Sequence, residues 1–176
     1  RKNNKLVSYL KMKETTNEED KIKYFKRCVI ITEKQIEQCK ELLDLMGIPY
    51  IQAPEEADTQ CAYLAKEGFV DGVLTNDMDI LTFGAPIIYR NLISYKLEPE
   101  IIKLDDILKR LKLDHEEFVE FCILLGCDYC TGITKIKPNI IYNYYIIYKN
   151  IPDTLKALKN DKYDVKNIKY VPAKEY

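Results

Sequence analysis

The sequence lacks the residues and segments that would mark several common classes of protein. Its 176 residues include a single histidine, His115, and no apolar run approaches the length of a membrane span. No signal peptide and no internal repeat are apparent. Cys127 and Cys130 have the C-x-x-C spacing of zinc ligands, but no second pair completes the four ligands of a structural zinc site. His115 follows Asp114 at a predicted helix start, where we expect a solvated first-turn residue.

The composition is that of a globular protein with reduced thiols. Apolar residues make up 47% of the chain and charged residues 31%, as in ordinary soluble domains. The six cysteines are not spaced like a secreted disulfide framework, so we expect free thiols in an intracellular protein. The first residue is Arg1 rather than Met, within a highly charged segment, and we expect the chain to begin partway into a longer protein.

Charge is distributed unevenly along the chain, although the net charge is only −1. Residues 1–50 carry 11 basic and 8 acidic side chains, residues 51–130 carry 7 and 16, and residues 131–176 carry 9 and 4. An acidic middle between basic flanks suits a metal centre whose flanking segments bind a polyanion. Ordinary surface charge explains the same pattern equally well.

The order of predicted elements indicates an α/β fold. Apolar periodicity and capping signals predict helices at residues 33–46, 55–67, 104–111, 116–125, 138–149 and 153–158, and strands at 48–52, 72–75 and 87–92. The lysine-rich residues 1–27 suggest two helical arms joined by a loop, and the apolar stripe of the helix at 33–46 is expected to be core. Alternating strands and helices predict a parallel sheet flanked by helices, followed by a helical unit. We expect divisions at 1–27, 28–103, 104–160 and 161–176.

Acidic residues end three apolar stretches of the chain. Glu56 and Asp58 follow Pro54 in a predicted first helical turn, Asp77 and Asp79 follow a predicted strand, and Asp128 follows a predicted helix. In an extended chain, Asp77 and Asp79 would point the same way. Two carboxylates about 4 Å apart repel by about 4 kcal/mol at an effective dielectric near 20, so a cluster needs divalent cations. Helix caps and surface acids are the alternative interpretation.

A second chemistry is open to Asp77-Met78-Asp79. Phosphatases of the haloacid dehalogenase type place an Asp-x-Asp motif after a strand and use the first Asp as a covalent nucleophile. Their motif has Thr or Val two residues after the second Asp, where this chain has Leu81. The match is therefore imperfect.

Three longer stretches together resemble one family. The runs 46–58, 75–84 and 122–130, which read MGIPYIQAPEEAD, TNDMDILTFG and CILLGCDYC, are similar in wording, order and spacing to flap endonucleases. The resemblance extends from about Phe25 to Lys156. It implies a PIN-like 5′ nuclease core whose amino-terminal part is missing, with an appended helix-turn-helix DNA-binding unit.

The resemblance also implies an activity and its cofactors. Flap endonucleases cleave 5′ flaps and 5′ ends at DNA junctions in replication and repair, with two Mg²⁺ ions, for which Mn²⁺ can substitute. Carried over by position, the metal-ligating and catalytic carboxylates are Glu56, Asp58, Asp77, Asp79 and Asp128, and Asp58 replaces the usual Glu. Two further family aspartates come from a region before Arg1, so we expect the isolated chain to be nearly inactive.

A DNA-binding surface is implied at Gly132, Ile133, Lys135 and Lys137. The two lysines occupy later glycine positions of the family's turn, which puts its potassium site in doubt but keeps attraction to phosphate. The arms at 1–27, including Lys26 and Arg27, resemble in place the arch that contacts single-stranded DNA. A non-catalytic module that binds branched DNA is the alternative. We further expect a monomer, in the nucleus, with any sliding-clamp contact made by a carboxyl-terminal region.

Overall fold

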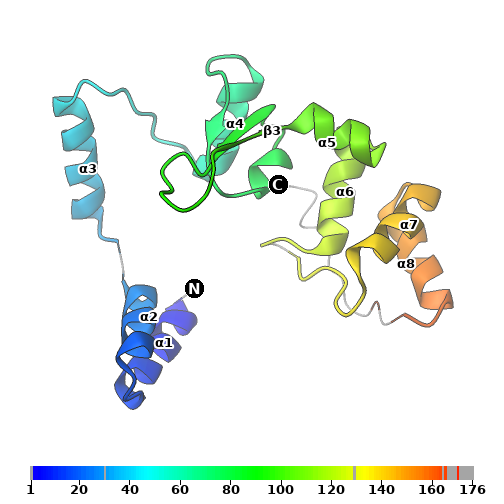
Figure 1. The fold of residues 1–176 in the computed structure, drawn as a ribbon, viewed down its shortest axis with the longest axis horizontal. Helices are drawn as coiled ribbons and strands as arrows, with labels where there is room; N and C mark the ends of the chain where they lie inside the picture. Colours follow the sequence, from blue (N-terminus) through cyan, green and yellow to red (C-terminus); the bar gives the residue numbers. More distant parts are fainter. Residues whose placement is uncertain (1, 30, 129, 164, 166–169, 171–176) are drawn as a thin grey trace. The chain divides into compact units, whose positions relative to one another are not determined.

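The computed structural model describes residues 2–29, 31–128, 130–163, 165 and 170. The chain forms two compact units, Arg1–Gln52 and Ala53–Tyr176 (Figure 1). The first contains the helices α1 (Lys2–Glu14), α2 (Glu18–Cys28) and α3 (Glu33–Leu45). The second contains α4 (Ala57–Lys66), β1 (Val73–Leu74), the 3₁₀ helix η1 (Asp79–Leu81), β2 (Ile87–Arg90), β3 (Glu100–Lys103), α5 (Leu104–Leu111), α6 (His115–Leu125), α7 (Pro138–Tyr148) and α8 (Ile151–Asn160). Most of the predicted tail at 161–176 lies outside the described residues.

The first unit begins with the two predicted helical arms. Helices α1 and α2 pack against each other and are joined by a short loop. Asn17 ends this loop by accepting a hydrogen bond from the Glu19 amide (2.9 Å), which caps α2. Lysines are frequent in both helices, and no described residue of α2 is buried. Within the described residues, no helix is long and apolar enough to cross a membrane.

Helix α3 starts where the sequence predicts and buries less than expected. Thr32 and Gln35 form the predicted capping box, with the Gln35 side chain accepting from the Thr32 amide (2.9 Å). The prediction that its apolar stripe is core is wrong for the described structure, which buries no residue of α3 and leaves Leu42 56% exposed. An apolar stripe becomes core only where another element covers it, and the extensive helix contact in this unit joins α1 to α2.

The second unit is built on a small mixed sheet in the order β1-β2-β3. Strands β1 and β2 are parallel, with Val73 opposite Ile88, as the predicted strands at 72–75 and 87–92 required. Strand β3, which the sequence did not predict, adds an antiparallel edge. The predicted strand at 48–52 is wrong, because this segment is irregular and a strand requires a hydrogen-bonded neighbour. The α/β fold class is confirmed.

Side-chain contacts in the helical part of the second unit join α6 to α7 and α8. Asp114 and Glu117 form the predicted capping box at the start of α6, and Phe121 packs edge-on against Tyr142 of α7 (5.7 Å between ring centroids). The Glu120 carboxylate accepts hydrogen bonds from the hydroxyl group of the fully buried Tyr145 (3.1 Å) and from the Ile151 amide of α8 (3.2 Å). These contacts connect α6 to both following helices.

Candidate functional site

Asp77 and Asp79 lie in a turn rather than in an extended strand. Strand β1 stops at Leu74, and the Thr75 hydroxyl group accepts a hydrogen bond from the Asp77 amide (3.0 Å). The Asp77 carboxylate in turn accepts from the Asp79 amide (3.0 Å), which starts η1. The expectation that the two side chains align through strand alternation is therefore wrong. The local hydrogen bonds of an Asx turn determine the direction of Asp77 instead.

Glu56 and Asp58 lie at the start of α4. Glu56 is the N-cap residue, and its side chain makes no capping hydrogen bond. Asp58 lies in the first turn, where the positive end of the helix dipole favours a carboxylate. Both side chains are exposed. Ala62 and Ala65, four and seven residues after Asp58 on the same face of α4, are buried in the core.

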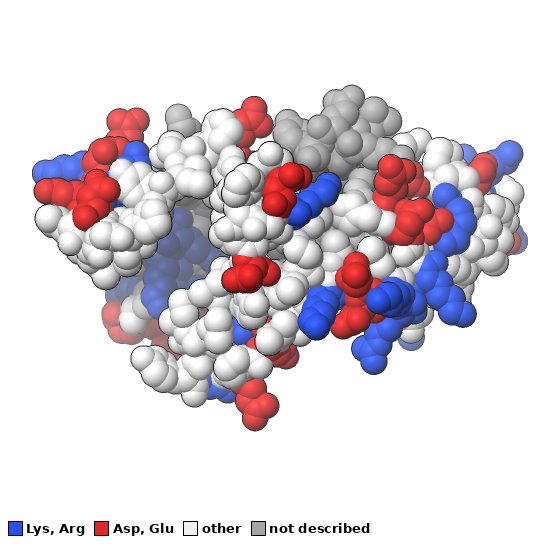
Figure 2. Space-filling view, turned by 90° about the horizontal axis from the view of Figure 1, so that it is seen from above, with Lys and Arg blue, Asp and Glu red and all other residues white. Residues whose placement is uncertain are grey.

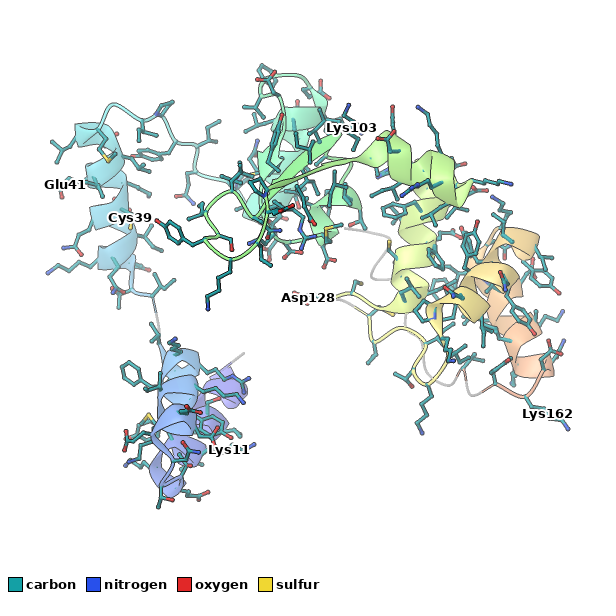
Figure 3. All side chains as sticks on the ribbon, viewed as in Figure 1. Lys11, Cys39, Glu41, Lys103, Asp128 and Lys162 are labelled. Carbon is teal, nitrogen blue, oxygen red and sulfur yellow. The ribbon has the colours of Figure 1, made fainter. Side chains whose placement is uncertain are left out.

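Asp128 occupies the tip of a tight hairpin that follows α6 (Figure 3). The base of the hairpin is closed by a hydrogen bond from the Ile133 amide to the Leu124 carbonyl oxygen (2.8 Å). Nearer the tip, Cys127 and Cys130 form an antiparallel bridge, with reciprocal backbone hydrogen bonds of 2.8 and 3.1 Å. The C-x-x-C spacing therefore closes a turn around Asp128.

Two glycines let the strands of this hairpin approach closely. Gly126, at the end of α6, has φ +111°, and Gly132 has φ +63°, both in the region that L side chains rarely adopt. A Cβ on Gly132 would lie 2.4 Å from the Gly126 amide nitrogen. Gly126 makes the tight turn before Asp128, and Gly132 makes that turn possible.

The charges of three of the predicted acids act on a fourth, Asp79. Protein atoms around the Asp79 carboxyl group desolvate it, and the charges of Asp77, Asp128 and Asp58 raise its pKa further. Glu56 is not among the groups that shift this pKa. Acids from three separate parts of the chain thus share one electrostatic environment.

Cys122, in the last turn of α6, is close enough to Asp79 for its charge to act on the thiol. Burial raises the pKa of its thiol to about 12, and the negative charge of Asp79 and the neighbouring Cys127 add to this shift. The last turn of α6 therefore lies beside the turn that carries Asp79. Cys122 stays protonated at neutral pH because both burial and negative charge disfavour a thiolate.

The donor set fits a hard divalent cation, although the acids are not closed around one point. Within the described residues, no group of three or more His, Cys, Asp or Glu side chains is arranged to hold a metal ion. Carboxylate oxygens are the ligands that Mg²⁺ and Mn²⁺ prefer, and the mutual repulsion at Asp79 is what a cation would relieve. Closing such a site requires these exposed carboxylates to move together.

His115 connects α6, which precedes the Asp128 hairpin, to η1, which begins at Asp79. The sequence did not reveal this role. The Nε2 atom of His115 lies 3.2 Å from the carbonyl oxygen of Leu81, to which it donates in the Nε2-protonated tautomer. The prediction of a solvated residue is wrong, since His115 is half-buried against η1. The contact holds the start of α6 next to the end of η1, and nothing in the local sequence signals it.

The predicted DNA-binding residues of the second unit differ in their solvent exposure. Ile133 is only 6% exposed and its amide binds Leu124, so neither its side chain nor its amide is available to DNA. Lys135 and Lys137 are exposed at the start of α7. Lys135 has φ +66°, the left-handed conformation that glycine favours, whereas Lys137 has an ordinary φ of −67°. Lys135 thus keeps the backbone conformation of a glycine at this position.

Lys26 and Arg27 belong to the first unit, in the last turn of α2, where both are exposed. Basic residues there are favoured by the negative end of the helix dipole whether or not they bind DNA. On the face drawn in Figure 2, basic and acidic side chains are interspersed. The charges on that face therefore do not identify a separate basic surface for binding DNA phosphates.

Comparison with known proteins identifies the class to which this fold and site belong. Residues 47–128 match the family model of the XPG I-region, which covers Glu56, Asp58, Asp77, Asp79 and Asp128. The chain is 38% identical to the solved flap endonuclease-1 from Methanococcus jannaschii, with a TM-score of 0.66 over 86% of this chain and 48% of that one. It is 35% identical to the catalytic core of Rad2 in complex with DNA substrate, with a TM-score of 0.69 over 79% and 46%. A third similar structure is the Holliday junction-resolving enzyme GEN1 in complex with product DNA and Mg²⁺, at 27% identity and a TM-score of 0.55 over 68% of this chain and 30% of that one.

Residues 47–128 thus carry the XPG I-region, and the chain is similar to flap endonuclease and Rad2 structures. Among curated relatives it is similar to flap endonuclease 1, with 44% identity over 152 residues to that of Uncinocarpus reesii and 42% identity over 151 residues to that of Homo sapiens. These alignments cover 85% and 84% of this chain but 38% and 40% of the relatives. The chain therefore spans about two-fifths of the length of the curated relatives it matches.

Proposed function

We propose that the chain is part of a structure-specific nuclease that hydrolyses phosphodiester bonds in flapped or branched DNA, as a 5′ flap endonuclease and 5′-3′ exonuclease. The observation that carries the proposal is the shared environment of Asp58, Asp77, Asp79 and Asp128 within a chain that carries the XPG I-region. The relatives named above include a flap endonuclease and a Holliday junction-resolving enzyme, which favours phosphodiester hydrolysis over phosphatase chemistry at Asp77.

The proposed cofactors are two Mg²⁺ ions, which Mn²⁺ can replace, and the GEN1 structure with product DNA and Mg²⁺ supports this choice. Asp58, Asp77, Asp79 and Asp128 would hold them, with Glu56 at the N-cap of α4 as a fifth ligand. Bound Mg²⁺ supplies a lowered pKa for the attacking water and neutralises charge on the scissile phosphate.

The protein's own residues orient this site. The Asp79 amide holds the Asp77 carboxylate through a 3.0 Å hydrogen bond, and the hairpin closed by Cys127 and Cys130 presents Asp128. His115 keeps α6, which carries that hairpin, against η1. No protein nucleophile is required, so no covalent intermediate forms on the chain.

DNA contact is proposed at Lys135 and Lys137, with Lys26 and Arg27 on the helical arms, whereas the predicted Gly132 is buried and shapes the hairpin. Exposed lysines attract phosphate without reading sequence, which suits an enzyme that recognises the shape of a junction. The Cβ of Lys135 lies where a glycine would leave the backbone bare, so we propose direct contact by the ammonium group in place of a potassium-bridged one.

A cleavage assay with a longer protein that contains this chain tests the proposal. We expect cleavage of a labelled 5′ flap in Mg²⁺, lost in both Asp77→Asn and Asp128→Asn and kept in a control, Asp105→Asn, in the first turn of α5. Full activity in both site variants would refute the site. Binding of flapped DNA without any cleavage would instead support the non-catalytic alternative.

Several properties of the whole protein are proposed on the same basis. We place it in the nucleus as a monomer and assign any sliding-clamp contact to a carboxyl-terminal region. We propose that the arms (1–27), the α/β core (28–103) and the helical DNA-binding region (104–160) act as separate functional parts. The isolated chain is expected to be nearly inactive, because the family resemblance implies two further aspartates.

A further inference from the structure

Two thiols lie on either side of Asp128 in the hairpin that follows α6. Cys127 and Cys130 are free thiols that face each other across an antiparallel bridge, and both of their backbone hydrogen bonds are made. Residues opposite each other in such a bridge have Cα atoms about 5.5 Å apart and side chains on the same face of the ladder. A disulfide joins Cα atoms about 4.4 to 6.8 Å apart, so the spacing of this pair permits the bond.

We propose that Cys127 and Cys130 form a reversible disulfide that closes the turn carrying Asp128. The oxidant we name is a low-molecular-weight disulfide such as glutathione disulfide. The thiolate of the half-buried Cys127 attacks it, which forms a mixed disulfide and releases one glutathione thiol. The sulfur of the buried Cys130 then attacks the Cys127 sulfur and releases the second glutathione thiol. Two thiols lose two electrons and two protons, and one glutathione disulfide becomes two thiols.

The burial of the two residues sets the order of these steps. Cys130 is 6% exposed, so an external disulfide cannot reach it first, whereas Cys127 is accessible next to the exposed Gly126. Cys122 lies near enough to interact with Cys127, but it belongs to the last turn of α6 rather than to the bridge. The geometry therefore selects Cys130 over Cys122 as the resolving thiol.

The bond should be easily reduced. Cβ atoms of directly opposed residues are about 4.5 to 5.5 Å apart, whereas a disulfide needs about 3.5 to 4.5 Å. The strands must be pulled together at the tip while Gly126 and Gly132 hold them in close contact at the base. Strained disulfides are the labile and regulatory ones, and an intracellular protein forms such bonds transiently.

The consequence for the site rests on the proposed function. Pulling Cys127 toward Cys130 changes the turn in which Asp128 lies and moves its carboxylate relative to Asp79. Disturbing the residues that orient metal ligands commonly lowers metal affinity about 10- to 100-fold. We therefore expect oxidation to weaken Mn²⁺ binding by about tenfold or more.

The bond itself is tested on the 176-residue chain, without any activity assay. After incubation with glutathione disulfide, intact mass and thiol alkylation should show the loss of two hydrogens and two alkylation sites, restored by glutathione. The tryptic peptide after Lys112 that ends at Lys135 contains Cys122, Cys127 and Cys130, so variants must locate the bond. We expect Cys122→Ser to keep the change and both Cys127→Ser and Cys130→Ala to abolish it.

Three results would overturn the inference: no loss of hydrogens, a glutathione adduct that stays on Cys127, or loss of the change in Cys122→Ser but not in Cys130→Ala. Because Cys130 is buried, circular dichroism checks that its variant folds, and the partly exposed Cys127→Ser provides an independent test. Mn²⁺ titration of a longer protein that contains this chain, in its reduced and oxidised forms, then separates the two proposals. Absence of binding in the reduced protein counts against the metal site, whereas equal binding in both forms counts against the switch.

Discussion

Replacing Gly132 by alanine should destabilise the second unit strongly, because the added methyl group has no space. A Cβ atom at this position would lie 2.4 Å from the Gly126 nitrogen, 2.5 Å from the Leu125 carbonyl carbon and 2.6 Å from the Gly126 Cα atom. All three are backbone atoms, so no side chain can rotate away. The backbone at Gly132 also has φ +63°, which an L residue adopts only with strain.

The expected magnitude has two parts. A left-handed conformation costs an L residue about 1 to 2 kcal/mol, and forcing extra atoms into a packed site costs about 1 to 3 kcal/mol more. Gly132→Ala should therefore lower the free energy of unfolding by about 2 to 5 kcal/mol. This is a large share of the roughly 5 to 15 kcal/mol that stabilises a typical domain.

Gly68→Ala is the matched control. Gly68 belongs to the same unit and has φ +76°, but a Cβ atom added there would have no heavy atom within 4 Å outside its immediate chain neighbours. It should therefore show the conformational cost alone, about 1 to 2 kcal/mol. Urea unfolding of both variants, followed by circular dichroism, measures the difference. A Gly132→Ala variant no less stable than Gly68→Ala would refute the close approach of the two strands, and with it the described position of Asp128.

Other substitutions test separate parts of the structure. Lys135→Gly should stabilise the chain by about 0.5 to 1 kcal/mol, because glycine adopts the left-handed backbone of this position without strain. Lys137→Gly, at an ordinary φ, should destabilise the chain by a similar amount in the same urea assay. The reverse order of stability would contradict the conformation of Lys135. Because the folded state raises the pKa of Asp79, it binds that proton more tightly than the unfolded state, and stability is lost as pH rises above the ordinary Asp range. Asp79→Asn should therefore be more stable than the parent at neutral pH in the absence of divalent cations, with the difference vanishing in acid, and a less stable variant at neutral pH would argue against convergence of the acids. Tyr145→Phe removes a hydroxyl group that donates to a carboxylate inside the helical part and should cost about 1 to 3 kcal/mol in thermal or urea unfolding, unlike Tyr148→Phe on the partly exposed end of α7.

Helix ends were predictable because their signals are local. The capping boxes at Thr32 and Asp114 need only residues three positions apart, and both helices start where these pairs indicate. Helix α5 has the predicted bounds, and α7 begins at Pro138, whose fixed φ suits a first helical turn. Such interactions are complete within a few residues of chain, so tertiary contacts do not alter them.

Strands and buried faces were harder to predict because they depend on distant partners. Residues 48–52 have the apolar character of a strand but no ladder, while β3 forms because β2 offers it an edge. The stripe of α3 has helical period, yet the described structure buries none of it. A periodic pattern shows which face of an element is apolar, and only the neighbouring element makes that face core.

The sequence by itself determined which acids could form a site, since wording and spacing mark Glu56, Asp58, Asp77, Asp79 and Asp128. It also determined the family resemblance and the starts of the helices capped by Thr32 and Asp114. Tertiary structure decided how these acids are held: an Asx turn orients Asp77, a hairpin closed by Cys127 and Cys130 carries Asp128, and His115 holds α6 beside η1. The physical reason is the distance along the chain between the residues that interact. Hydrogen bonds within a turn are encoded by neighbouring residues, whereas the approach of carboxylates far apart in the chain depends on the packing of helices and strands that separate them.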